Sequence, residues 1–169
     1  AYKEMGKQRR HLDYISDIAS LATQSNVTKK QLANFIVNAI VIVTKVDAAS
    51  LRIYNPKDDR YHVISQSGFG EEWQTTKAIH SSGSLQEKAM EIGMPLKIFD
   101  IFNEPRYTNK SLARKYGMRS ALIIPLVVRG EKIGSITLYI SQDGNLNRLD
   151  DEFIEIFSTQ AAIALSLAK

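Results

Sequence analysis

The three histidines are the first side chains to consider for catalytic or metal-binding chemistry. His11, His62 and His80 lie far apart, with no H-x-x-x-H pair and no carboxylate pattern typical of a metal site. The sequence around His11, RRHLDY, does not resemble the phospho-acceptor box of a histidine kinase. A structural or solvent-exposed role is therefore the favoured interpretation of each histidine.

The densest group of acids, Asp150-Asp151-Glu152, falls in the first turn of a predicted helix, where the helix dipole accounts for it. No nucleophile–base pair accompanies it, and Gly68-Phe69-Gly70 is too short a signal for a phosphate-binding loop. The chain has no cysteine, which excludes disulfides, thiolate metal ligands, cysteine nucleophiles and thioether-linked cofactors. We therefore expect neither an enzyme nor a covalently bound cofactor.

One short segment concentrates positive charge, and it has two interpretations. Its basic residues are Arg106, Lys110, Arg114, Lys115 and Arg119. The favoured interpretation is a solvated helix face. In the alternative, Arg106 or Arg119 turns inward and binds an anionic ligand, which suits the forked guanidinium group. Four aromatic residues could line such a pocket or fill it as core: Trp73, Tyr107, Tyr116 and Tyr139.

Composition favours one soluble domain. A chain of 169 residues that is 44% hydrophobic can bury a sizeable core. The net charge of +4 is modest and its basic residues are interspersed with acids, so we expect no nucleic-acid partner. The longest apolar run, residues 35–43, is interrupted by Asn38 and is shorter than the roughly 20 residues that span a bilayer. We expect a cytoplasmic fragment without membrane contact.

The elements that must position these side chains centre on residues 119–141, which read as a long antiparallel hairpin with a turn at Arg129-Gly130. This turn would pair Leu126 with Ile133 and Ile124 with Ser135. One predicted face is apolar and carries Ala121, Ile123, Pro125, Gly134, Ile136, Leu138 and Ile140. The other carries Ser120, Leu122, Ile124, Leu126, Ile133, Ser135, Thr137 and Tyr139.

The first of these strands lacks polar alternation, so we expect the sheet to be covered on both sides. The hydroxyls of Ser135, Thr137 and Tyr139 would then be buried. Because an unpaired buried hydroxyl costs about 1 to 3 kcal/mol, a polar side chain, a water or a ligand should meet them.

Helical and strand periodicities give the element order ααββαβαββα. The predicted helices cover residues 3–24, the segment after the Thr28 capping box, the short segments after Ser84 and Asn109, and the segment after Asn147. The predicted strands cover residues 48–54, 60–67 and 96–101 and the two arms of the hairpin. Residues 68–82 lack a clear period and are expected to form a loop, in which a short strand near residues 77–79 stays open. The fold class is therefore α+β, an antiparallel sheet with long helices on one face and short helices and loops on the other.

The second helix is apolar on more than one side. Val37, Val41 and Ile42 lie off its main face, which suggests a second buried surface. Both terminal helices are expected to continue beyond the ends of the chain. We therefore predict a parallel homodimer through the terminal helices.

The spacing of many residues resembles the GAF domain family. The matching segments are Ser82-Gly83-Ser84-Leu85, Gly93-Met94-Pro95-Leu96, Ile98, Asp100, Glu104-Pro105-Arg106, Gly117 to Leu126, Gly130, Ile133-Gly134, Asp150 and Gln160 to Ala164. The resemblance covers about residues 28–168. It implies a PAS-like six-stranded antiparallel sheet, a small-molecule pocket beside the short helices, and terminal helices that relay signals in dimeric sensor proteins.

The subfamily stays open. Bilin attachment and free methionine sulfoxide reduction depend on cysteine in GAF proteins, and the chain has none. The Asn-Lys…Phe-x-x-x-Asp-Glu pattern of cyclic-nucleotide phosphodiesterases is also broken, because Asp151-Glu152 precedes Phe153. The family position of Asp100 implies that it holds the loop at a strand end.

The resemblance thus implies a signalling helix over residues 1–26 and a GAF domain over residues 27–169. We expect a regulatory sensor of an unknown small molecule, coupled in cis to an output domain, as in two-component systems. The alternative is a ligand-free dimerisation or interaction module. The predicted ligand-binding residues are Trp73, Asp100, Arg106, Tyr107, Tyr116, Arg119, Ser135, Thr137 and Tyr139.

Overall fold

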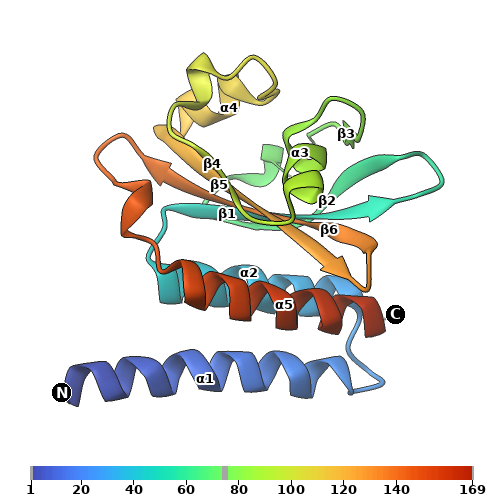
Figure 1. The fold of residues 1–169 in the computed structure, drawn as a ribbon, viewed down its shortest axis with the longest axis vertical. Coiled ribbons are helices and arrows are strands. Elements are labelled where there is room, and N and C mark those ends of the chain that lie inside the picture. Colours follow the sequence, from blue (N-terminus) through green and yellow to red (C-terminus); the bar gives the residue numbers. More distant parts are fainter. Residues whose placement is uncertain (1, 74–75, 169) are drawn as a thin grey trace.

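A computed structural model describes residues 2–73 and 76–168 (Figure 1). Its helices are α1 (Tyr2–Ala22), α2 (Lys29–Thr44), α3 (Leu85–Ile92), α4 (Lys110–Lys115) and α5 (Asp151–Leu167). Its strands are β1 (Ala48–Asn55), β2 (Arg60–Ser67), β3 (Ile79–His80), β4 (Leu96–Ile98), β5 (Met118–Val128) and β6 (Glu131–Ser141). Short 3-10 turns cover Glu71–Trp73, Ile101–Asn103 and Leu146–Arg148.

The six strands form one antiparallel sheet in the order β3-β2-β1-β6-β5-β4, which confirms the predicted α+β class. Helices α2 and α5 lie against one face, and α3 and α4 lie on the other (Figure 1). The three long helices lie on one side of the sheet, as predicted, and α1 is the outermost of them (Figure 1). This helix forms a further layer beneath α2 and α5 (Figure 1).

The capping signals explain where two of these helices begin. Thr28 accepts a hydrogen bond from the Gln31 amide at 3.1 Å, and the Gln31 side chain accepts one from the Thr28 amide at 2.9 Å, as the capping box predicts. The last helix begins after Asp150, whose carboxylate accepts a bond from the Phe153 amide at 3.1 Å. The predicted start at Asn147 is wrong, because that residue lies in a separate 3-10 turn.

The register of the central hairpin differs from the prediction by one residue. Leu126 pairs with Gly134, not Ile133, and Ile124 pairs with Ile136, because the pairing shifts at a bulge next to the turn. A one-residue shift exchanges the two faces of one strand relative to the other. Ala121 and Ile123 therefore share a face with Tyr139, while Leu122, Ile124 and Leu126 pack with Ile136, Leu138 and Ile140 against the long helices.

Helix α1 belongs to the same core as α2 and α5. Ile18 of α1 is fully buried, whereas Leu12 is 65% exposed. On α2, Val37 is buried and Val41 packs partly against this core, but Ile42 is 60% exposed. The chain's own α1 therefore covers part of the predicted second surface, and dimerisation remains a prediction.

Candidate functional site

An open cleft lies on the α3 side of the sheet, between the β3–α3 segment and the loop before α4. Its volume is about 450 Å³, and His80, Ser82, Arg106 and Asn109 are among its lining residues. A small inner cavity of about 10 Å³ shares Ile79, Arg106, Thr108 and Asn109 with this cleft. The inner cavity has room for about one water molecule.

Among the described residues that line the inner cavity, Arg52 is the one cation that is almost completely buried, with 3% of its surface exposed. Alternation along β1 turns Ala49 and Leu51 toward the long helices and Arg52 toward the opposite face. Its guanidinium donates hydrogen bonds to the backbone carbonyl of Tyr61 at 3.0 Å and to that of Lys77 at 3.5 Å. It also contacts the Thr76 hydroxyl at 3.5 Å.

No carboxylate among the described residues forms an ion pair with Arg52. Burial lowers the pKa of its guanidinium, but an arginine side chain still carries its charge at neutral pH. The site therefore holds a desolvated positive charge. Its hydrogen bonds to neutral oxygens offset only part of the free-energy cost of desolvation.

Neutral polar groups complete the cavity wall. Gln86 of α3 is buried, and Thr137 and Tyr139 of β6 face it across the cavity. The Tyr107 hydroxyl donates to the Tyr139 hydroxyl at 3.3 Å, and burial raises the pKa of both phenols. On the same strand, the buried Ser135 hydroxyl has no hydrogen-bond partner among the described residues.

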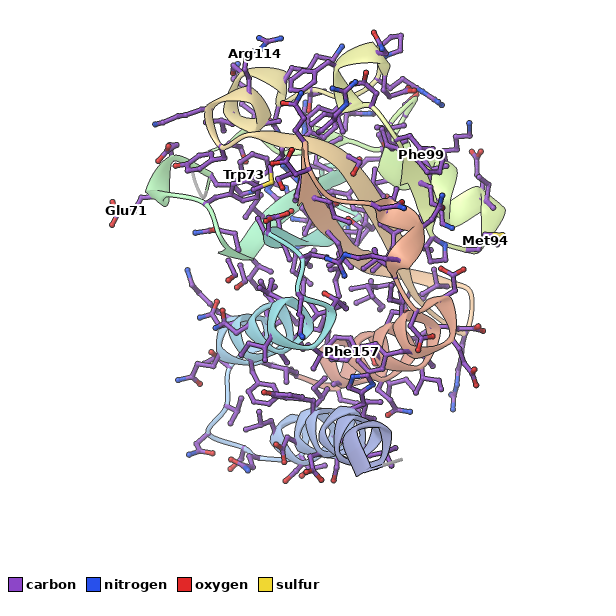
Figure 2. The ribbon with its side chains drawn as sticks, turned by 90° about the vertical axis from the view of Figure 1, so that its left-hand side faces the viewer. Glu71, Trp73, Met94, Phe99, Arg114 and Phe157 are labelled. Atoms are coloured by element: carbon purple, nitrogen blue, oxygen red, sulfur yellow. The ribbon has the colours of Figure 1, made fainter. Side chains whose placement is uncertain are left out.

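The other predicted aromatic residues form a packed cluster instead of a pocket wall. Trp73 is fully buried and stacks on Phe69, with ring centroids 4.0 Å apart, and both rings meet Tyr139 edge-on. Tyr116 packs edge-on against Phe69. Figure 2 shows Trp73 inside the upper layer and Glu71, on the same turn, pointing outward. Trp73 and Tyr116 are absent from the linings of both cavities described above.

The three charged residues of the predicted site do not converge on one cavity. Asp100 caps the turn after β4 by accepting from the Phe102 amide at 3.1 Å. Arg119 donates to Asp100 at 3.4 Å and has an exposed side chain that lines neither cavity, so the alternative in which it turns inward to bind a ligand is wrong. Arg106 lines both cavities and pairs with Glu104 at 2.7 Å.

A polar contact fastens the loop that carries Trp73 to α4. The carboxylate of Glu72 accepts hydrogen bonds from Lys115, at 2.7 Å, and from the Tyr116 hydroxyl. The Gly70 amide donates to the same hydroxyl at 2.8 Å. The bond from Lys115, with that from Tyr116, lowers the pKa of Glu72 to about 2.

We expect the Glu72→Gln variant to lose a pH-dependent part of the stability. Because the pKa of Glu72 is lower in the folded state, its contribution is present above the ordinary value of 4.5 and is lost as the pH falls toward about 2. The melting-temperature difference between parent and variant should therefore be constant above about pH 5 and shrink toward pH 2. Glu71→Gln, on the exposed side of the same turn, is the control. A difference that persists unchanged at pH 2 contradicts this role.

Comparison with known proteins decides the family. The GAF domain family model matches residues 30–165. The chain belongs to the GAF family. GAF domains are sensory and regulatory domains of signalling proteins.

Known relatives agree with this placement. A protein of Caenorhabditis elegans named probable 3',5'-cyclic phosphodiesterase pde-5 is 24% identical over an alignment that covers 99% of this chain and 24% of that protein. This GAF chain thus spans about a quarter of the length of that relative. The GAF domains of phosphoenolpyruvate-protein phosphotransferases from Coxiella burnetii and Acinetobacter share its fold. The Coxiella burnetii domain has a TM-score of 0.73 and 19% identity, and the match covers 94% of this chain and 91% of that one. The Acinetobacter domain has a TM-score of 0.72 and 17% identity, and the match covers 92% of both chains.

Within residues 2–73 and 76–168, no group of three or more His, Cys, Asp and Glu side chains is arranged to hold a metal ion. None of the described helices combines the length and the apolar character needed to cross a membrane.

Sequence reasoning missed Arg52 and Gln86. The signal for Arg52 was available, because it occupies the polar phase of a strand that lies inside a sheet covered on both faces. The same argument that singled out Ser135 and Thr137 applies to it. Gln86 gave no such signal, since its burial depends on how α3 docks on β5.

Proposed function

We propose that this GAF domain is a regulatory sensor of a small anionic molecule that binds in the cleft and reaches Arg52. The observation that carries the proposal is the buried Arg52 guanidinium, which has no carboxylate partner among the described residues. A buried unpaired charge costs several kcal/mol, and an anion that reaches it recovers part of this cost. Arginine also suits planar, two-pronged recognition of carboxylates and phosphates.

The cleft supports this proposal because it shares lining residues with the inner cavity that Arg52 lines. Arg106 lies at both the cleft and the inner cavity, so it is positioned to meet an anion on its way inward. Ser82 and Thr108 offer hydroxyl groups along the cleft. An anion larger than a water molecule must displace side chains around the inner cavity, and that displacement is the proposed signal.

The terminal helices are the proposed route for this signal. β1 and β6, which carry Arg52, Thr137 and Tyr139, also supply Leu51, Ile136 and Leu138 to the core beneath the sheet. That core includes α2, α5 and Ile18 of α1. A shift of these strands therefore changes the surface on which the terminal helices pack, and we propose that an output domain in cis responds to it.

A ligand screen tests the proposed function. Melting temperatures are measured with cyclic and linear nucleotides, organic phosphates and dicarboxylic acids. A ligand at a hundred times its dissociation constant should stabilise the parent protein by about 2.7 kcal/mol. We expect Arg52→Met to abolish this shift, while the ligand-free variant is as stable as the parent or up to about 2 kcal/mol more stable.

Arg119→Met is the matched control, because this arginine is exposed and lines neither cavity. It should keep the ligand-induced shift. The proposal fails if no anion in the library shifts the parent, or if Arg52→Met responds to the ligand as the parent does.

A second candidate function is a ligand-free interaction module. The inner cavity of about 10 Å³ favours it, as do exposed apolar side chains on the three long helices, namely Leu12, Ile42, Ile156, Ile163 and Leu167. Native mass spectrometry of the freshly purified protein separates the two candidates. A retained small anion supports the sensor, and a ligand-free homodimer supports the interaction module.

A further inference from the structure

A hollow lies outside the proposed ligand site, at the β4–β5 edge of the sheet. It is a groove of about 840 Å³. Met90 and Met94 lie on its α3 side, Pro125 and Val127 lie along β5, and Asp151 and Glu155 lie on α5. Figure 2 shows Met94 and Phe99 on this edge of the molecule, above α5.

The groove exists because β4 begins only opposite Ile123 of β5. β4 has three residues and pairs only with Ala121–Ile123, whereas β5 continues to Val128. Pro95, directly before β4, lines the groove where the chain arrives from α3. The backbone of β5 from Ile124 to Val128 is therefore paired with β6 on one side and with no described strand on the other.

The two walls of the groove differ in chemistry. The wall on the α3 side is apolar, and Met94 is 58% exposed. The wall on the α5 side carries Asp151 and Glu155 above the hydroxyls of Ser158 and Thr159. Lys97 lies 4.0 Å from Asp151, while Glu155 forms no ion pair among the described residues.

We propose that this groove binds an extended peptide segment of a partner protein as an additional strand on the free edge of β5. Side chains of a strand point alternately to the two faces of a sheet, so those of the added strand point alternately to the α3 wall and to the α5 wall. The segment that fits therefore alternates apolar residues, which contact Met90 and Met94, with basic residues, which meet Glu155 and Asp151.

Pro125 makes the pairing selective. Proline lacks an amide hydrogen and is typical of edge strands, where it discourages edge-to-edge association. The peptide must therefore donate hydrogen bonds at this position and accept them elsewhere along the edge. The exposed edge is therefore suited to one specific strand. The groove walls on the two faces of the sheet select this strand by contacting its side chains.

The test uses a fluorescently labelled seven-residue peptide that alternates valine and lysine, titrated with the complete chain and followed by anisotropy. A valine–glutamate peptide and a valine–lysine peptide N-methylated on alternate amides are the controls. We expect saturable binding of the first peptide and at least about tenfold weaker binding of both controls, because one loses the charge match and the other loses the backbone hydrogen bonds. Amide chemical-shift changes should concentrate in residues 90–97, 124–128 and 151–162.

Two variants separate the groove from general electrostatic attraction. Glu155→Lys should weaken the binding of the valine–lysine peptide about three- to tenfold, as expected when an exposed attractive charge pair becomes a repulsive one. Glu152→Lys, on the exposed side of the same helix turn, changes the net charge equally but does not line the groove, so it should have less effect. The inference is overturned if the N-methylated peptide binds as tightly as its parent, if both variants weaken binding equally, or if the peptide does not bind.

Discussion

Replacing Gly134 by alanine should destabilise the domain by about 3 kcal/mol or more. Gly134 lies on β6, where it pairs with Ile53 of β1 and Leu126 of β5. An added Cβ would lie 2.0 Å from the carbonyl oxygen of Arg52 and 3.1 Å from the Cα of Ile53. Both contacts are with backbone, which cannot rotate away as a flexible side chain does, so β1 must separate from β6.

Urea unfolding followed by circular dichroism measures this effect. Gly130→Ala is the control, because no heavy atom lies within 4 Å of its added Cβ and its cost comes from a φ of +78°, about 1 to 2 kcal/mol. A loss at Gly134 no larger than the loss at Gly130 would show that the strands tolerate the added methyl group. Since the clash falls on Arg52, we also expect the Gly134 variant to bind anions poorly.

The second large effect is expected for Trp73→Ala, which should cost about 3 to 5 kcal/mol. Trp73 is fully buried against Phe69 and Tyr139, so its removal leaves a cavity in the core between α4 and the sheet. If Trp73 were the wall of an open pocket, its truncation would expose little new surface and cost much less. The variant therefore decides between the two interpretations that the sequence left open for this residue.

Trp73→Phe refines the result. The indole nitrogen of Trp73 is buried and has no hydrogen-bond partner among the described residues. Phenylalanine therefore removes an unsatisfied donor and keeps most of the aromatic surface. We expect a cost well below that of alanine. Phe99→Ala, at an aromatic side chain that is 59% exposed, should change the unfolding free energy by less than about 1 kcal/mol. Equal losses for all three variants would contradict the packed cluster.

The predicted binding site illustrates how far patterns in the sequence reach. Thr137 and Tyr139 were correctly placed on one covered face, where their hydroxyl groups need hydrogen-bond partners, because alternation along one strand is a local property. Its extension to β5 failed, because a bulge near the turn exchanged the faces of the partner strand. For Arg119, the structure agrees with the favoured solvent-exposed interpretation and not with the alternative in which it turns inward, since its exposed side chain contacts Asp100.

By itself, the sequence determined the elements and the family, because helix periodicity, capping boxes and turn glycines act within a few residues of one another. The tertiary structure alone decided what the covered face contains. Whether Trp73 fills the core or lines a pocket, and whether Arg52 pairs with a carboxylate, depends on how β1, α3 and the β2–β3 loop pack together. Those contacts join residues distant in the chain, and their energies depend on packing and desolvation that no local pattern encodes.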